Sequence, residues 1–408
     1  MARRRQVDAS ELRGLAQLAM HATLGLTDLV ESMHGGIARP WIAVGRRPPA
    51  GTRGITGLVY RSIRWTTRLT GTGVDAALAL ARGSRPGGPT PPGPPSPRRE
   101  ALVAALNGVL GDHLAETGNQ LAITPELRHQ GRALPLAADE LADTVPAAGP
   151  RVVLMIHGLC RSDLHWQRGG HDHGTALARD LGRTVIHARY NSGLHVSTTG
   201  RALASLLETV VRCWPVAVEE LAIVAHSMGG LVARSACHYA ELDGAEWPRR
   251  LRHLVFLGTP HHGAPLERGG QWLHRTVGAV PFARPLGRLG SIRSAGITDL
   301  RHGNLLDEDW QGRDRFAGGP DRRRPVPLPP AASCCVVAAT RARRRVALHD
   351  RLVGDGLVPV GSALGRHRDP ARTLPIPADR QWIATGSSHL DLLDSPEVYA
   401  RIRDWLGG

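Results

Sequence analysis

Ten residues, Leu221-Ala222-Ile223-Val224-Ala225-His226-Ser227-Met228-Gly229-Gly230, join an apolar run to a segment with a helical pattern. The apolar run is typical of a strand that is buried on both faces of a sheet. Ser227 then occupies a sharp strand-to-helix turn, which lifts a serine hydroxyl above the edge of the sheet. Such a turn needs small neighbours because strand and helix approach closely, and Ala225 and Gly229 meet that need. This segment therefore predicts a nucleophilic serine at the end of a buried strand.

Two further residues complete a candidate catalytic triad. A serine hydroxyl is a weak nucleophile unless a histidine removes its proton and a carboxylate orients that histidine. Asp355 lies in a tight turn, 354–356, after an apolar run, and His389 lies in a loop, 387–391, just before the last helical segment. The order Ser227, Asp355, His389 is the one that α/β-hydrolases show. Each residue alone also has a purely structural reading, so the prediction rests on their order and context.

The developing negative charge in such a reaction needs two hydrogen-bond donors. We predict that these are the backbone amides of Leu159 and Met228. Met228 follows the predicted nucleophile, and Leu159 follows His157-Gly158 at the end of the first buried strand. Folds of this kind place an oxyanion hole at these two points. Both residues act through their backbone, so their side chains are free to vary.

Strand-like and helix-like segments alternate from residue 151 onward. This alternation predicts an α/β fold with a mostly parallel sheet and helices on both faces. The expected strands are 151–156, 184–186, 221–225, 254–257, 335–339 and 381–384. The expected helices are 175–181, 200–213, 228–240 and 396–406, and Ser395 suits the N-cap of the last one.

Five segments together resemble the serine-hydrolase branch of the α/β-hydrolase superfamily. They are 157–159, 225–230, 257–263, 354–359 and 388–391, all within residues 151–408. The set is most similar to bacterial triacylglycerol lipases and esterases and to the lipase-like group that contains GPI inositol deacylases. That resemblance implies the α/β-hydrolase fold and assigns the orienting carboxylate to Asp355 and the base to His389. Ala225 replaces the first glycine of the usual turn motif, as it does in some lipase groups.

The 408 residues leave room for more than one domain. Residues 83–99 are almost all Pro, Gly, Ser and Arg, which predicts an extended linker. We expect a helical N-terminal region at 1–82 and an α/β-hydrolase domain at 100–408, with its catalytic core at 151–408. Residues 261–332 have no strong strand pattern and are too many for a simple loop, so they predict a helical cap or a lid.

Arginine supplies the whole basic excess, because none of the 51 Lys plus Arg residues is a lysine. The missing lysine excludes P-loop, Schiff-base and Ser-x-x-Lys chemistry. The net charge of +15 could indicate contact with nucleic acid, an anionic membrane surface or an acidic substrate, or it could reflect a bias of composition. A basic helix at about 55–69 could lie on such a surface or pair with the helix at 12–33 through its apolar side. Aromatic residues are only 4% of the chain, which disfavours nucleic-acid binding.

The cysteines, the apolar runs and the candidate metal ligands bear on location and cofactors. Five cysteines without a CxxC pair predict reduced thiols. The sequence has neither a signal-like segment nor an 18-residue apolar run, which favours a cytoplasmic protein, with peripheral membrane attachment as the alternative. No cofactor and no catalytic metal is expected. The resemblance makes Asp391 a candidate calcium ligand, but local capping or pairing is favoured because no convincing second carboxylate accompanies it. The histidines at 165, 171 and 173 match no hydrolase metal signature.

These residues together predict a serine hydrolase that cleaves carboxylic esters through an acyl-enzyme intermediate. The expected substrates are small-molecule or lipid esters. An apolar acyl chain is favoured because the expected cap contains Trp272, Leu273, Val277 and Phe282. Two alternatives stay open. The same triad supports acyl transfer or thioester cleavage, and a protein of another class would be an inactive membrane-associated scaffold or binding module.

Overall fold

The computed structural model describes residues 14, 16, 17, 19, 20, 97–264, 293–315, 320–343 and 354–408. The chain forms two compact units, one of residues 1–94 and 114–122 and one of residues 95–113 and 123–408. The five described residues before position 97 are helical. The rest of the predicted N-terminal helices, and the linker up to residue 96, lie outside the described residues, so the predicted domain boundaries stay predictions.

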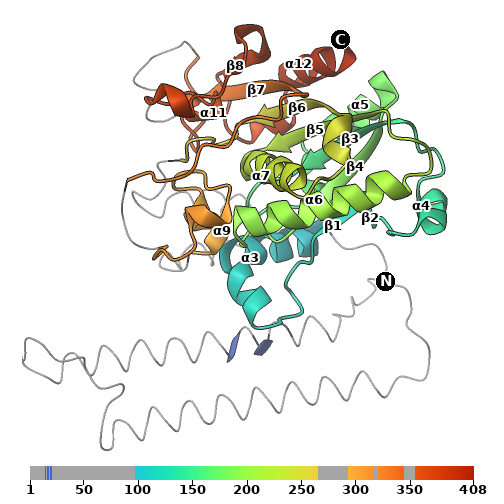
Figure 1. Cartoon of the computed structure of the whole chain (residues 1–408), viewed down its shortest axis with the longest axis horizontal. Helices are drawn as coiled ribbons and strands as arrows, with labels where there is room; N and C mark the ends of the chain where they lie inside the picture. The colour runs from blue at the N-terminus through green and yellow to red at the C-terminus, as the bar shows by residue number, and fades with distance from the viewer. Residues whose placement is uncertain are drawn as a thin grey trace, which may run out of the picture. The chain divides into compact units, whose positions relative to one another are not determined.

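The second unit is built on an eight-stranded sheet (Figure 1). Its order is β2-β1-β4-β3-β5-β6-β7-β8. The strands from β3 to β8 pair in parallel, whereas β1 pairs antiparallel with β2 and β4. This confirms the predicted mostly parallel sheet. The strands are β1 (Glu126–His129), β2 (Arg132–Ala133), β3 (Arg151–Ile156), β4 (Thr184–Arg189), β5 (Glu220–His226), β6 (Leu251–Leu257), β7 (Ser333–Thr340) and β8 (Gln381–Thr385).

Helices cover both faces of this sheet. Alternate residues of the strands point to opposite faces, and Met155 and Leu154 of β3 are both fully buried. Met155 faces the side on which α5 and α12 pack, and α6 and α7 pack against each other in front of the sheet in Figure 1. The helices are α3 (Pro97–Glu116), α4 (Ala138–Thr144), α5 (His173–Leu181), α6 (Val196–Cys213), α7 (Met228–Leu242), α9 (Ala295–Asp299), α11 (Val360–Ala363) and α12 (Pro396–Gly407).

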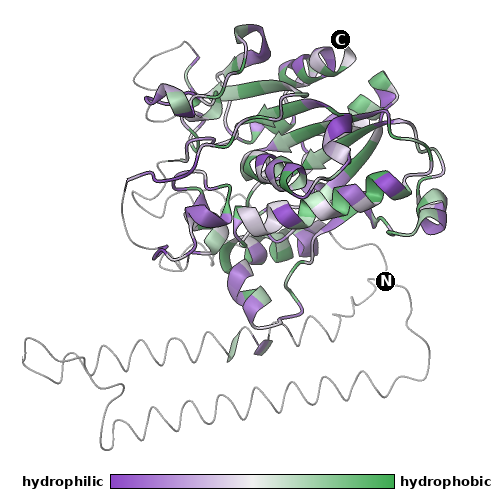
Figure 2. Cartoon of the chain, viewed as in Figure 1, coloured by the Kyte–Doolittle hydropathy of each residue, from purple (hydrophilic) through white to green (hydrophobic). Residues whose placement is uncertain are grey.

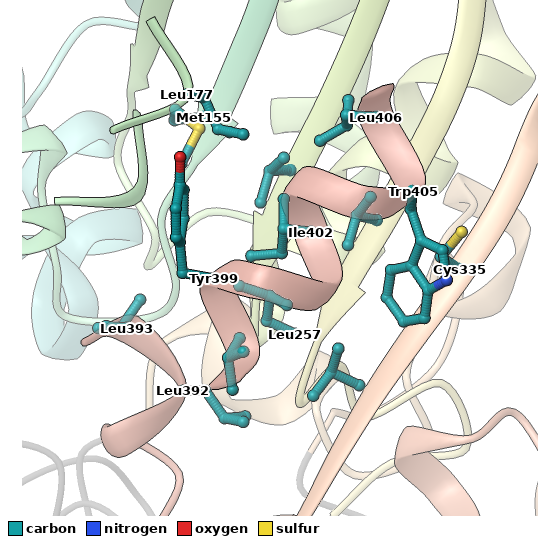
Figure 3. Close-up of a cluster of buried hydrophobic side chains, with 14 of the residues drawn as sticks. Met155, Leu177, Leu257, Cys335, Leu392, Leu393, Tyr399, Ile402, Trp405 and Leu406 are labelled. Atoms are coloured by element: carbon teal, nitrogen blue, oxygen red, sulfur yellow. The ribbon is translucent and has the colours of Figure 1, made fainter. Parts of the chain in front are cut away.

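Helix α12 closes the core at the end of the chain. Ser395 caps its first turn, because the Ser395 hydroxyl accepts a hydrogen bond from the Val398 N–H at 3.3 Å, as the sequence predicts. Its apolar side includes Ile402 and Trp405, which face the sheet near Leu257 and Cys335 (Figure 3). The central strands of the sheet are also largely hydrophobic, as the green colour in Figure 2 shows. Because α12 packs against the sheet, it also holds the loop between β8 and α12 close to the sheet.

The expected cap is described only in part, at 261–264, 293–315 and 320–332. These parts contain α9 and a short 3-10 turn at Asp307–Asp309, and none of their residues belongs to a strand. The four apolar residues expected to line the cap, at 272, 273, 277 and 282, lie outside the described residues. Within the described part of the chain, no helix combines the length and the apolarity that crossing a bilayer requires.

Replacing Ile402 by alanine tests the packing of α12. The Ile402 side chain is fully buried, so we expect Ile402→Ala to lower the free energy of unfolding by about 2–5 kcal/mol through lost contacts and the cavity left behind. Urea denaturation followed by circular dichroism measures this change. Arg403→Ala is the control on the same helix, since its side chain is 46% exposed and pairs only with Asp404. A loss below about 1 kcal/mol for Ile402→Ala would contradict this packing.

Candidate active site

Ser227 occupies a strained turn between β5 and α7. Its backbone angles are φ 56° and ψ −127°, a combination that residues with a side chain rarely adopt. The Ser227 N–H donates to the Leu257 carbonyl at 2.8 Å, and the Ser227 carbonyl accepts from the Gly230 N–H at 3.0 Å. The turn is therefore held on one side by the end of β6 and on the other by the first turn of α7.

Two glycines allow the backbones at this turn to come together. A Cβ atom on Gly158 would lie 2.9 Å from the Cβ atom of Ser227, and one on Gly229 would lie 2.5 Å from the His157 carbonyl oxygen. Real Cβ atoms essentially never approach other atoms so closely, so only glycine fits without a shift. The loop after β3 and the start of α7 consequently pack directly against the candidate nucleophile.

His389 and Asp355 form a buried pair. His389 Nδ1 lies 2.7 Å from Asp355 Oδ2, and the two residues are 4% and 2% exposed. The other carboxylate oxygen, Asp355 Oδ1, accepts hydrogen bonds from the N–H groups of Leu357 and Val358, each at 2.8 Å. An ionised Asp355 therefore accepts the proton on His389 Nδ1. This leaves the lone pair of His389 Nε2 available to accept a proton from a neighbouring hydroxyl.

Two other residues, to which sequence analysis assigns no such role, hold the His389 ring in place. The His226 ring lies 4.7 Å from the His389 ring, and His226 Nε2 donates to the His389 carbonyl at 3.1 Å. Burial, with a smaller effect of His389, lowers the pKa of His226 well below its usual range, so His226 is neutral. A Cβ atom on Gly258 would lie 3.0 Å from His389 Cε1. Both residues belong to motifs noted in the sequence, but only their spatial contacts reveal the function.

The candidate oxyanion donors lie at the ends of β3 and β5. Leu159 follows β3 and Met228 begins α7, and both are buried. Among the described residues, no group accepts a hydrogen bond from the N–H of either one. The loop after β3 is fixed by its neighbours, because Tyr190 donates to the His157 carbonyl at 2.5 Å and the Cys160 N–H donates to Ser192 Oγ at 3.0 Å. Nothing in the sequence around Tyr190 and Ser192 indicates this support.

The hydroxyl of Ser227 has no hydrogen-bond partner among the residues that the structure describes. The same holds for Nε2 of His389. Catalytic hydrogen bonds are often long or poorly aligned in the free enzyme and tighten when substrate binds. The carboxyl ends of the parallel strands thus bring together the loop after β3, the turn at Ser227 and the pair of Asp355 and His389. Ser227 Oγ and His389 Nε2 make no hydrogen bond to another described residue there.

The other residues singled out in the sequence have local roles. Asp391 accepts a hydrogen bond from the Ser388 N–H at 2.8 Å and pairs with Arg168 at 3.3 Å, which agrees with the favoured local reading. His173 contacts His171 at 2.8 Å and the Leu392 carbonyl at 2.9 Å. Within the described ranges, no three His, Cys, Asp or Glu side chains are grouped so that they could hold a metal.

All five cysteines are free thiols, as the sequence predicts. Cys160, beside the candidate oxyanion loop, is fully buried, and burial raises the pKa of its thiol to about 12. A Cβ atom on Gly108 of α3 would collide with Cys160, so this thiol packs tightly against that helix. Cys160 is therefore protonated at neutral pH and serves as a packing residue rather than a nucleophile.

Three bacterial proteins of known structure are similar to this chain over 53–64% of its length. Lipase BlEst2 of Bacillus licheniformis is 18% identical, with 64% of this chain and 93% of that chain covered and a TM-score of 0.41. The Staphylococcus hyicus lipase is 13% identical, with 64% and 94% covered and a TM-score of 0.37. Phospholipase PlaB of Legionella pneumophila is 18% identical, with 53% and 46% covered and a TM-score of 0.34.

None of the curated proteins compared with the chain matches it. The family described as PGAP1-like alpha/beta domain matches residues 194–322, which run from the start of α6 into the segment before β7. This match agrees with the resemblance that the sequence motifs predict. The chain thus has the mostly parallel, helix-covered sheet predicted for an α/β-hydrolase fold, and its residues 194–322 match the family described as PGAP1-like alpha/beta domain.

Proposed function

We propose that this protein is a serine hydrolase that cleaves carboxylic esters. Ser227 is the nucleophile, His389 is the general base, and Asp355 orients and stabilises His389. The observation that carries the proposal is the buried hydrogen bond of 2.7 Å between His389 Nδ1 and Asp355 Oδ2, beside a strained serine turn. Fold similarity alone would not support an activity, because one fold hosts many functions.

The reaction follows from the available atoms. Ser227 Oγ attacks the ester carbonyl carbon while His389 Nε2 takes the hydroxyl proton, and Asp355 stabilises the resulting imidazolium. The negative oxygen of the tetrahedral intermediate accepts hydrogen bonds from the N–H groups of Leu159 and Met228. His389 then returns the proton to the alcohol as the carbon–oxygen bond breaks. Water attacks the acyl-enzyme in the second half of the reaction and releases the carboxylic acid.

Several features support esters as the substrate class. The two amide donors of Leu159 and Met228 have no other acceptor among the described residues, so they are available to the oxygen of an ester carbonyl. Residues 194–322 also match the PGAP1-like alpha/beta domain family, in line with the lipase-like group that the sequence motifs resemble. Acyl transfer and thioester cleavage would use the same triad, and they differ only in the acceptor or in the leaving atom. A peripheral contact with an anionic membrane surface stays a prediction.

Substitution of the triad tests the proposal directly. We expect the intact protein to be labelled by a fluorophosphonate probe and to hydrolyse p-nitrophenyl esters, and Ser227→Ala to do neither. Asp355→Asn should lower kcat by about 10⁴-fold, because the amide favours the wrong tautomer of His389. Ser205→Ala, at an exposed position of α6, is the matched control and should keep full labelling. A folded intact protein that neither labels nor hydrolyses any ester would refute the enzyme assignment and favour the binding-module alternative.

Adding one methyl group beside Ser227 tests the geometry of the turn. Gly158→Ala places its Cβ atom 2.9 Å from the Ser227 Cβ atom, so the loop that carries Leu159 must move away. We expect the rate of fluorophosphonate labelling to fall by roughly 10²-fold or more, the loss typical of a misplaced oxyanion donor. Gly361→Ala is the matched control, because its Cβ atom would meet nothing within 4 Å. Equal labelling rates in both variants would show that Gly158 does not control the site.

A further inference from the structure

A cavity of about 490 Å³ lies next to the residues of the proposed triad and oxyanion hole. Arg161 lines it two positions after Leu159, and Leu390 lines it one position after His389. The remaining lining includes Leu164, His165, Arg168 and Leu393. None of the described residues that line this cavity is acidic. Its volume is within the range of pockets that bind whole small molecules.

The guanidinium of Arg161 is largely buried and has no hydrogen-bond partner among the described residues. Arg161 is 9% exposed, and its Nε and Nη2 atoms are buried and make no hydrogen bond. No carboxylate among the described residues pairs with it. Arg128 shows the usual arrangement of a buried arginine, since it pairs with Asp163 at 3.3 Å. A buried cation is costly without such compensation, so Arg161 is poised for an anion from outside the described chain.

Arg161 is still charged at neutral pH. Burial lowers the pKa of its guanidinium to about 10, with a smaller lowering by Arg168 and a small raise from Cys160. Arg168 itself does not supply free charge, because it pairs with Asp394 at 2.9 Å and with Asp391 at 3.3 Å. Arg161 is therefore the cation of this cavity that has no carboxylate partner among the described residues.

The neutral ring of His165 supplies a second hydrogen-bond donor to the lining of this cavity. Its Nδ1 accepts a hydrogen bond from the Ser162 N–H at 3.0 Å, so the proton of the neutral ring is on Nε2. Burial, together with the charges of Arg161 and His157, lowers the pKa of His165 to about 3. Besides the carboxylate-paired Arg168, the lining of the cavity thus includes the Arg161 guanidinium and the His165 ring N–H, which are both donors, and three leucine side chains.

The position of this cavity links it to the candidate site. Arg161 lines it two positions after Leu159, and Leu390 lines it one position after His389. A substrate whose ester carbonyl lies at Ser227 can therefore extend a negatively charged group into this cavity.

We infer that this cavity selects esters that carry a phosphate group, with Arg161 as the residue that binds the phosphate and the leucines contacting the adjoining apolar part. A guanidinium suits this role because its N–H groups match two phosphate oxygens at once. The inference rests on the proposed ester hydrolysis and names its substrate class. It makes Arg161 a specificity-determining residue and assigns it no part in the proton transfers.

Two esters that differ only by a phosphate test this inference. One is 1-hexanoyl-glycerol 3-phosphate and the other is 1-hexanoyl-glycerol, whose short acyl chain keeps both in solution as monomers. We expect the intact protein to have a kcat/KM for the phosphate ester that is about 10- to 100-fold higher, the range for hydrogen bonds to a charged group. Arg161→Gln should abolish this preference and leave kcat/KM for the neutral ester within about twofold. Arg161→Lys should keep part of the preference, since it retains the charge but not the two-point contact.

Controls separate the alternatives. Arg132→Gln, at an exposed position on the edge strand β2, should behave like the intact protein. Thermal unfolding of Arg161→Gln should show no loss of Tm, because the substitution removes an uncompensated buried charge, whereas a structural role for Arg161 would lower Tm and both kcat/KM values together. Inorganic phosphate should inhibit hydrolysis of the neutral ester by the intact protein but not by Arg161→Gln.

Each remaining outcome identifies what has failed. An intact protein that hydrolyses both esters equally overturns the inference and leaves the ester hydrolase standing. Inhibition by inorganic phosphate without a preference for the phosphate ester indicates a site for free phosphate, which also overturns the substrate assignment. An intact, folded protein that hydrolyses neither ester and is not labelled by the fluorophosphonate refutes the proposed function itself.

Discussion

Close contact between backbones at the carboxyl ends of three strands is the constraint on which this site depends. The loop after β3, the turn after β5 and the end of β6 meet within van der Waals distance, and a side chain on Gly158 or Gly229 would not fit between them. The hydrogen bond from the Ser227 N–H to the Leu257 carbonyl belongs to the same contact. This packing holds Ser227 in its strained backbone conformation, which an isolated segment would not maintain.

The same edge of the sheet explains how distant segments reach one site. Parallel strands all end at one edge, so the loops after β3, β5, β6, β7 and β8 emerge side by side. Asp355 follows β7 and His389 follows β8, and both are buried there. Helix α12 packs against the sheet immediately after the histidine loop, so the burial of Ile402 and its neighbours also holds His389 in position.

Buried ionisable groups around the site differ in whether they carry a charge at neutral pH. The histidines at 157, 165 and 226 have lowered pKa values and are neutral, chiefly because of burial. Arg161 is equally buried but stays charged, because a guanidinium begins from a much higher pKa. An arginine can therefore hold positive charge in a dry site where a histidine cannot. This difference underlies the anion binding that we propose for the cavity beside the candidate triad.

The sequence by itself determined the alternation of strands and helices and the turn at Ser227, because apolar runs and small flanking residues are local properties. It also predicted Asp355 and His389 as candidates from their order, and the structure brings these two into contact. It could not reveal that His226 and Gly258 support His389, that Tyr190 supports the loop after β3, or that Arg161 has no partner among the described residues. Those facts depend on which side chains meet across the sheet edge, and only the tertiary structure decides that, because burial and pairing arise from contacts between residues far apart in the chain.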